Sequence, residues 1–111
     1  MSNDPPGPDL SSLADLDRLV HEPGRLLVMA CLSVVEQADY LYVLKQTGLT
    51  QGNLSSHLAK LERSGYITVQ KTFQGKVPRT VLRMTKTGRE AFLKYRAQIL
   101  KALADPQLPN L

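Results

Sequence analysis

A run of small polar side chains followed by two basic ones occupies residues 50–63. Hydroxyl and amide groups exchange hydrogen bonds with the edges of heterocyclic bases, whereas lysine and arginine pair with phosphate groups. The start of a helix also offers free amides and a partial positive charge to an anion. The candidate binding residues in this run are Thr50, Gln51, Gly52, Asn53, Ser55, Ser56, His57, Lys60 and Arg63.

A second basic group surrounds an expected turn at residues 74–77. Lys71, Lys76 and Arg79 flank this turn, and Gly75 permits a tight tip. Basic side chains at such a tip can bind phosphate, and an arginine can enter a minor groove. The alternative is a basic hairpin that only keeps an edge strand soluble.

Charge is distributed unevenly along the chain. Residues 1–40 contain seven acidic and two basic side chains, whereas residues 41–104 contain twelve basic and two acidic ones. A compact basic segment is typical of a protein with a polyanionic partner. A basic surface that is merely solvated is the alternative, because charge runs are commonly no more than that.

Other kinds of chemistry have little support in the sequence. Cys31 is the single cysteine, so an internal disulfide is excluded and no thiol cluster exists to bind a metal. No apolar run is long enough to cross a bilayer, and the N-terminus does not resemble a secretory signal. We therefore expect a cytoplasmic protein that is not an enzyme and has no metal site, cofactor or membrane association.

Hydrophobic periodicity and capping residues predict the helices that position these side chains. Asp39, Thr50 and Thr85 are expected to cap helices, and Gly48 is expected to end one in a left-handed conformation. The expected helices are Leu13–Val20, Pro23 to about Val35, Tyr40–Thr47, Gln51 to about Ser64 and Lys86–Ala104.

The helix that begins at Gln51 has two distinct faces. Leu54, Leu58 and Leu61 are spaced along one face and should be buried, which turns the polar and basic side chains outward. His57 lies beside the apolar stripe, so a half-buried histidine bonded to the backbone fits as well as a contact with phosphate or a base. A solvated face would more often carry Glu and Lys pairs, so we favour binding.

The sequence period changes to two after Gly65. Residues 66–73 and 79–84 alternate in polarity and predict two strands joined by a turn. Helices, a tight turn, a further helix, a hairpin and a long last helix together predict a winged helix-turn-helix, an α+β fold that is mainly α. We expect one domain over residues 13–104, between a flexible tail at 1–12 and a C-terminal tail at 105–111.

The segment from Thr47 to Phe92 resembles the winged-helix repressors of the MarR and ArsR type. The similarity is carried by TGLTQGNLSSHLAKLE, by SGYI, by the wing pattern K-x-F-x-G-K-x-P-R-T and by T-x-x-G-R before the last helix. With the preceding helices it covers residues 13–104. The resemblance implies a transcription regulator that binds operator DNA as a homodimer, and it does not indicate which genes.

The last helix carries two apolar stripes, where one would suffice for packing on a single domain. Together with the apolar helix at residues 23–35, they predict a twofold dimer interface, and a self-contained core is the alternative. The expected interface residues are Leu13, Leu16, Leu19, Phe92, Tyr95, Ile99, Leu100 and Leu103.

Taken together, the sequence predicts a homodimeric, sequence-specific regulator of transcription that binds double-stranded DNA, acts as a repressor and associates with the nucleoid. The helix at about 51–64 should enter the major groove, and the wing at about 71–80 should contact the backbone or the minor groove. The competing hypothesis is a winged-helix protein-interaction module without a DNA target. Such a module would place apolar or acidic residues on the outer face of this helix. No effector is indicated.

Overall fold

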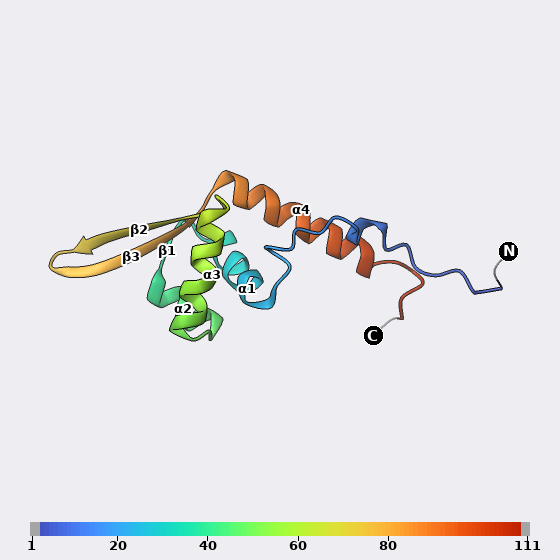
Figure 1. Cartoon of the computed structure of the whole chain (residues 1–111), viewed down its shortest axis with the longest axis horizontal. Coiled ribbons are helices and arrows are strands. Elements are labelled where there is room, and N and C mark those ends of the chain that lie inside the picture. Colours follow the sequence, from blue (N-terminus) through green and yellow to red (C-terminus); the bar gives the residue numbers. More distant parts are fainter. Residues whose placement is uncertain (1–2, 110–111) are drawn as a thin grey trace.

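The computed structural model describes residues 3–109. Residues 1–2 and 110–111, the outermost parts of the two expected tails, lie outside the described residues. Helices α1 to α3 form the centre, the β2–β3 hairpin projects on one side, and α4 runs away on the other (Figure 1). The predicted winged helix-turn-helix is thus confirmed. Its elements are η1 (Ser11–Leu13), α1 (Pro23–Ser33), β1 (Ala38–Asp39), α2 (Tyr40–Thr47), α3 (Gln51–Arg63), β2 (Ile67–Gln74), β3 (Val77–Met84) and α4 (Lys86–Leu103).

Capping side chains set the starts of α3 and α4, as the sequence predicted. The Thr50 hydroxyl accepts a hydrogen bond from the Asn53 amide, and the Thr85 hydroxyl accepts one from the Gly88 amide. Gly48 ends α2 with a φ of 69°, and its amide donates to the Leu44 carbonyl. These caps fix where the outer face of α3 begins.

The predicted helix at Leu13–Val20 is wrong. The chain forms only the short turn η1 and then irregular structure as far as α1. Asp17 is the physical reason, because one of its carboxylate oxygens accepts the backbone amides of Leu19 and Val20. A side chain that satisfies nearby amides in this way competes with helical hydrogen bonds.

The N-terminal segment lies along α4 (Figure 1). The Ser12 hydroxyl donates to the Gln98 carbonyl, and the Asp15 carboxylate accepts from the Gln98 amide group. Farther toward the N-terminus, the Asp9 amide donates to the carboxylate of Asp105 just beyond α4. Part of the expected tail at residues 1–12 is therefore hydrogen-bonded to this end of the molecule.

The sheet contains three strands in the order β1-β3-β2, all antiparallel, rather than the predicted two. Strand β1 was missed because two residues, Ala38 and Asp39, are too few to show a period. The β2–β3 ladder extends from Ile67 opposite Met84 to Gln74 opposite Val77, so the hairpin is longer and its turn tighter than expected.

The core lies between α1, α3 and the base of the hairpin. Leu54, Leu58 and Leu61 are buried as predicted, and they define the inner face of α3. Other buried members are Val20, Val28, Met29, Leu32, Ala38, Val43, Ile67, Leu82 and Tyr95. Helix α1 ends at Ser33 rather than near Val35, and part of its predicted apolar surface, at Leu27 and Val34, stays exposed.

The first turn of α4 is fastened to the base of the wing. The Thr85 amide donates to the Tyr66 carbonyl, and the Thr85 hydroxyl donates to the Gly65 carbonyl at 2.6 Å. Gly88 lies so close to Tyr66 that only a residue without a Cβ fits there. The wing and the long helix therefore share one rigid junction.

Residues 3–109 contain no candidate for a membrane-spanning helix or a metal site. No helix in this part of the chain is both long and apolar enough to span a membrane. Over the same residues, no three histidine, cysteine, aspartate or glutamate side chains come together in a way that could hold a metal ion.

Candidate nucleic-acid interface

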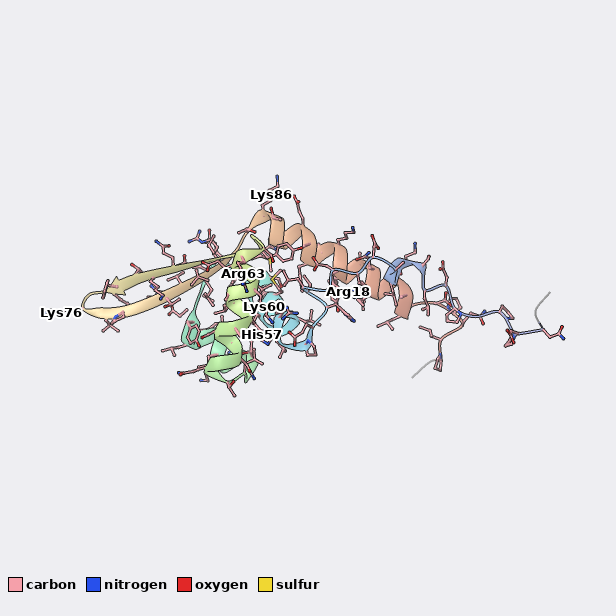
Figure 2. All side chains as sticks on the ribbon, viewed as in Figure 1. Arg18, His57, Lys60, Arg63, Lys76 and Lys86 are labelled. Atoms are coloured by element: carbon pink, nitrogen blue, oxygen red, sulfur yellow. The ribbon has the colours of Figure 1, made fainter. Side chains whose placement is uncertain are left out.

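The outer face of α3 is open to solvent along its whole length. The expected contact residues Gln51, Gly52, Asn53, Ser55, Ser56, Lys60 and Arg63 are all exposed, as is Thr50 at the cap. Lys60 and Arg63 follow one another along α3 in Figure 2. The short polar side chains lie at the helix start and the two long cations lie toward its end, which is the order that the sequence predicted.

Helix α2 holds the start of α3 through Tyr40, the first residue of α2. Its hydroxyl donates to the Gln51 carbonyl at 3.2 Å and lies 3.0 Å from the Ser55 hydroxyl. Ser55 therefore already has a partner inside the protein, whereas no such bond involves the side chains of Asn53 and Ser56 within the described residues. Of these three side chains, Asn53 and Ser56 are therefore the ones available to a binding partner.

His57 belongs to a contact between α3 and α1. Its side chain is 17% exposed. The Nδ1 atom of His57 lies 3.3 Å from a terminal nitrogen of Arg25 and 3.6 Å from a carboxylate oxygen of Glu22. The imidazole also presses against Gly24, where an added Cβ would come within 2.3 Å of Nε2. The sequence left open whether His57 is a half-buried histidine bonded to the backbone or a contact with phosphate or a base. The ring is half-buried, and its neighbours are the side chains of Arg25 and Glu22 rather than the backbone.

Glu22 lies between α1 and His57 in this contact, and the sequence analysis did not identify Glu22 as a residue of the site. Its carboxylate accepts the amides of Gly24 and Arg25 and thereby caps α1. Burial raises the pKa of Glu22, but the two amide hydrogen bonds, with help from the charges of His57 and Arg25, leave that pKa below its usual value. An ionised Glu22 thus orients α1 against α3.

The wing presents two free cations and one that is already paired. Lys71 and Lys76 are exposed and have no acidic partner within residues 3–109, and Lys76 lies at the far end of the hairpin (Figure 2). Arg79 instead donates through Nε to the carboxylate of Asp39 in β1. Asp39 was expected to cap α2, but its side chain makes no capping bond, because it binds Arg79.

The expected interface residues fall into two groups. Tyr95, which we expected between subunits, is 6% exposed, belongs to the core of its own chain and contacts Nδ1 of His21 through its hydroxyl. Phe92, Ile99, Leu16 and Leu19 pack against the same core, and Leu13 is half-buried. Leu100 and Leu103 are 50% and 67% exposed.

The second apolar stripe of α4 is open to solvent. Leu93, Ala97, Leu100 and Ala104 are all exposed. In the other stripe, Phe92, Tyr95 and Ile99 pack in or against the core, whereas Leu103 is exposed. The sequence argument that one stripe suffices for internal packing therefore agrees with the structure, and it leaves the other stripe without a partner among the described residues.

Comparison with known proteins places this geometry in a family. The family model described as a winged helix DNA-binding domain matches residues 25–103, which is most of the chain. An uncharacterized protein of Methanocaldococcus jannaschii is 36% identical over 78 residues, which span 69% of this chain and 84% of that protein.

Solved structures agree with this result. A transcriptional regulator homologue from Pyrococcus horikoshii superimposes with a TM-score of 0.73 at 29% identity, covering 81% of this chain and 87% of that one. A regulator of the MarR family from Porphyromonas gingivalis gives a TM-score of 0.63 at 19% identity, covering 91% and 93%, and shows the fold alone. The Pyrococcus horikoshii protein is described as a transcriptional regulator homologue. The family model matches most of the chain, and the polar face of α3 is exposed as a DNA-binding helix requires. The chain therefore belongs to the winged helix DNA-binding domain family.

Proposed function

We propose that the chain is a homodimeric repressor that reads operator DNA through α3. The observation that carries this proposal is the free outer face of α3. Within residues 3–109, the side chains of Asn53 and Ser56 near its start form no hydrogen bond, and Lys60 and Arg63 near its end have no acidic partner. Short side chains near the start of a recognition helix reach base edges, and long cations farther along reach phosphates.

Two copies are needed for a long, symmetric site. The exposed stripe of α4 supplies a self-complementary apolar surface, and a twofold axis there would present two α3 helices to successive major grooves. A dimer bound across a promoter would repress it by keeping other proteins from that DNA. The similarity of the chain to winged-helix repressors supports this sign of regulation.

Selection of bound sequences from a random duplex pool tests the proposal. We expect a palindromic consensus whose half-sites are separated by about one helical turn of DNA or a multiple of it. A protein-interaction module would enrich no sequence, and that result would exclude the proposed function.

Variants of α3 then separate base reading from phosphate binding. At one fixed salt concentration, Asn53→Ala and Ser56→Ala should each weaken the selected duplex by about 1–3 kcal/mol per lost base contact and leave random DNA unaffected. Lys60→Ala and Lys76→Ala should weaken both duplexes alike. Thermal melting serves as the folding control. Equal losses on both duplexes for Asn53→Ala would show that α3 is not the sequence reader.

A further inference from the structure

The tip of the wing is apolar as well as basic. Phe73 and Val77 are 69% and 65% exposed, and Pro78 beside them is also exposed. Single exposed apolar residues are ordinary on a protein surface, but here three fall within six consecutive positions around a two-residue turn. The hairpin projects from the body (Figure 1), and on one side its residues Val77 and Pro78 line an open hollow with residues 39–42.

The register of the hairpin shows which way this apolar surface faces. Phe73 pairs with Pro78 and Lys71 pairs with Thr80, so these four side chains lie on one face of the two-stranded ribbon. Lys71 and Thr80 line a hollow together with Ser55 and Ala59 of α3. The apolar pair at the tip therefore continues the surface that begins at the outer face of α3.

The charge around the tip selects the kind of partner. Residues 63–89 contain seven basic side chains and no acidic one. A partner that fits this surface must be anionic and must also present apolar area at the place where Phe73 lies. The minor groove of double-stranded DNA has both properties, because its phosphates flank walls made of deoxyribose.

Arginine is the side chain expected in a minor groove, but Arg79, which follows the Phe73–Pro78 pair in the hairpin, is held by Asp39 of β1. We infer that the wing tip enters the minor groove as an apolar wedge, with Phe73 against the sugars and Lys76 on the flanking phosphates. This inference rests on the proposed function and names a part of the site that the polar face of α3 does not include. Apolar side chains that enter the minor groove and insert between base steps partly unstack them and bend the duplex.

The salt dependence of binding to a mixed-sequence duplex provides the first test. Phe73→Ala should weaken binding about tenfold per wing, because a partly buried phenyl ring is lost, while the slope of log K against log[salt] stays unchanged. Lys76→Ala should make this slope shallower. Phe73→Leu should retain most of the affinity. Val34→Ala, which truncates an exposed apolar side chain outside the wing, should have no effect.

Base-pair substitutions in the flanks of the selected duplex provide the second test. Inosine–cytosine and guanine–cytosine pairs have the same major-groove edge and differ by the 2-amino group of guanine in the minor groove. The wild-type protein should prefer inosine–cytosine flanks, and Phe73→Ala should lose this preference. Bending measured by fluorescence energy transfer between the duplex ends should fall in the same variant.

The outcomes separate the two proposals. Wild-type affinity and wild-type flank preference in Phe73→Ala would overturn the wedge, even when the selection yields a consensus. A loss of affinity with the same reduction in salt slope as Lys76→Ala would also overturn it, because the contact would then be electrostatic. A selection without a consensus would exclude sequence reading by α3, and the mixed-sequence duplex would still decide the role of Phe73.

Discussion

An added methyl group at Gly88 would lie 2.1 Å from the carbonyl oxygen of Tyr66, a backbone atom that cannot rotate away. Gly24 is similarly enclosed, but its neighbour is the imidazole of His57, which is a side chain. Gly52 is the opposite case, because nothing lies within 4 Å of a Cβ built there. These glycines therefore have different reasons for lacking a side chain.

We predict that Gly88→Ala lowers the free energy of unfolding by ~1–3 kcal/mol or more, since α4 must move away from the wing base to make room. Urea denaturation followed by circular dichroism measures this quantity. An unchanged midpoint would show that the junction between Thr85 and Tyr66 yields readily.

Gly52→Ala should change stability in the other direction. Alanine in an exposed helical position is favoured over glycine by up to about 1 kcal/mol, so the urea midpoint should rise. Binding to the selected duplex should nevertheless weaken, because the methyl group keeps α3 from approaching the bases closely. Retained operator affinity in this more stable variant would place Gly52 outside the interface.

Tyr66 gives the chain a dependence on alkaline pH. Burial, with the hydrogen bond that its hydroxyl donates to Asp17, raises the pKa of Tyr66 from 10.0 to about 12. The folded state then keeps a proton that the unfolded state loses, so this contribution to stability is complete below pH 10.0 and is lost as the pH rises toward about 12.

The free energy of unfolding should accordingly fall more steeply above pH 10.0 in the wild type than in Tyr66→Phe. Absorbance titration of the phenol groups provides the matching readout, in which the variant lacks one late-titrating tyrosine. Tyr95, whose pKa burial also raises, stays present in both proteins. Identical pH profiles would rule out a role for the Asp17–Tyr66 contact.

Among the elements, the short strand β1 changes both the sheet and the charge of the wing, although it has only two residues. It adds a third strand to the sheet, and its Asp39 binds Arg79 in β3 at a point between the helix-turn-helix and the wing. Both side chains are about two-fifths exposed, at 44% and 35%, so the pair contributes little to stability. The ion pair with Asp39 occupies the guanidinium of Arg79, which we expected to bind DNA.

Asp39→Asn should release Arg79 and tighten non-specific DNA binding. The slope of log K against log[salt] should steepen by roughly 0.9 for each phosphate gained per subunit. The double variant that also carries Arg79→Ala should return the slope to the wild-type value, and Arg79→Ala alone should alter it little. A shallower slope in Arg79→Ala alone would show that the arginine already contacts phosphate.

Elements with strong caps and a clear period were predictable from the sequence. Thr50, Gly48 and Thr85 defined α2, α3 and α4 to within about a residue, because their local hydrogen bonds form in the structure as expected. Leu13–Val20 was not predictable in this way, since an apolar period there competes with the Asp17 carboxylate, which satisfies the local amides instead.

The site was predictable to the extent that it depends on one element. The exposed face of α3 follows from the 3.6-residue period alone. The partners of Ser55, His57 and Arg79 come from α2, α1 and β1, so no pattern within the 51–63 or 71–80 segments could reveal them. Tertiary contacts decided which of the expected contact residues stay free.

At the scale of the whole molecule, the fold is elongated, with a longest extent of 71 Å. The β2–β3 hairpin, the central helices, α4 and the N-terminal segment follow one another along this axis, and α4 lies beside the N-terminal segment rather than within the central bundle (Figure 1). A monomer that leaves Leu93, Leu100 and Leu103 exposed on such a helix has an apolar surface suited to a second copy.

Leu100→Asp should therefore dissociate the proposed dimer at micromolar concentration, because a charge in that contact costs several kcal/mol. The side chain is half exposed in the monomer, so the melting behaviour of the individual fold should be preserved better than with a change at the core-packed Ile99. Leu41→Asp, at an exposed position of α2, is the control. Sedimentation of the wild type as a monomer would refute the dimer.

The junction at Gly65, Tyr66, Thr85 and Gly88 makes α4 and the wing two arms of one lever. If α4 tilted about this junction together with the core residues packed on it, the hairpin tip would swing in the opposite sense. At about 1.5 Å per residue, the helix arm is roughly 27 Å long, so a shift of a few ångströms at its end moves Lys76 and Phe73 by a comparable distance. In the proposed dimer, a change in the distance between the two α4 helices would thus change the angle at which each wing meets DNA.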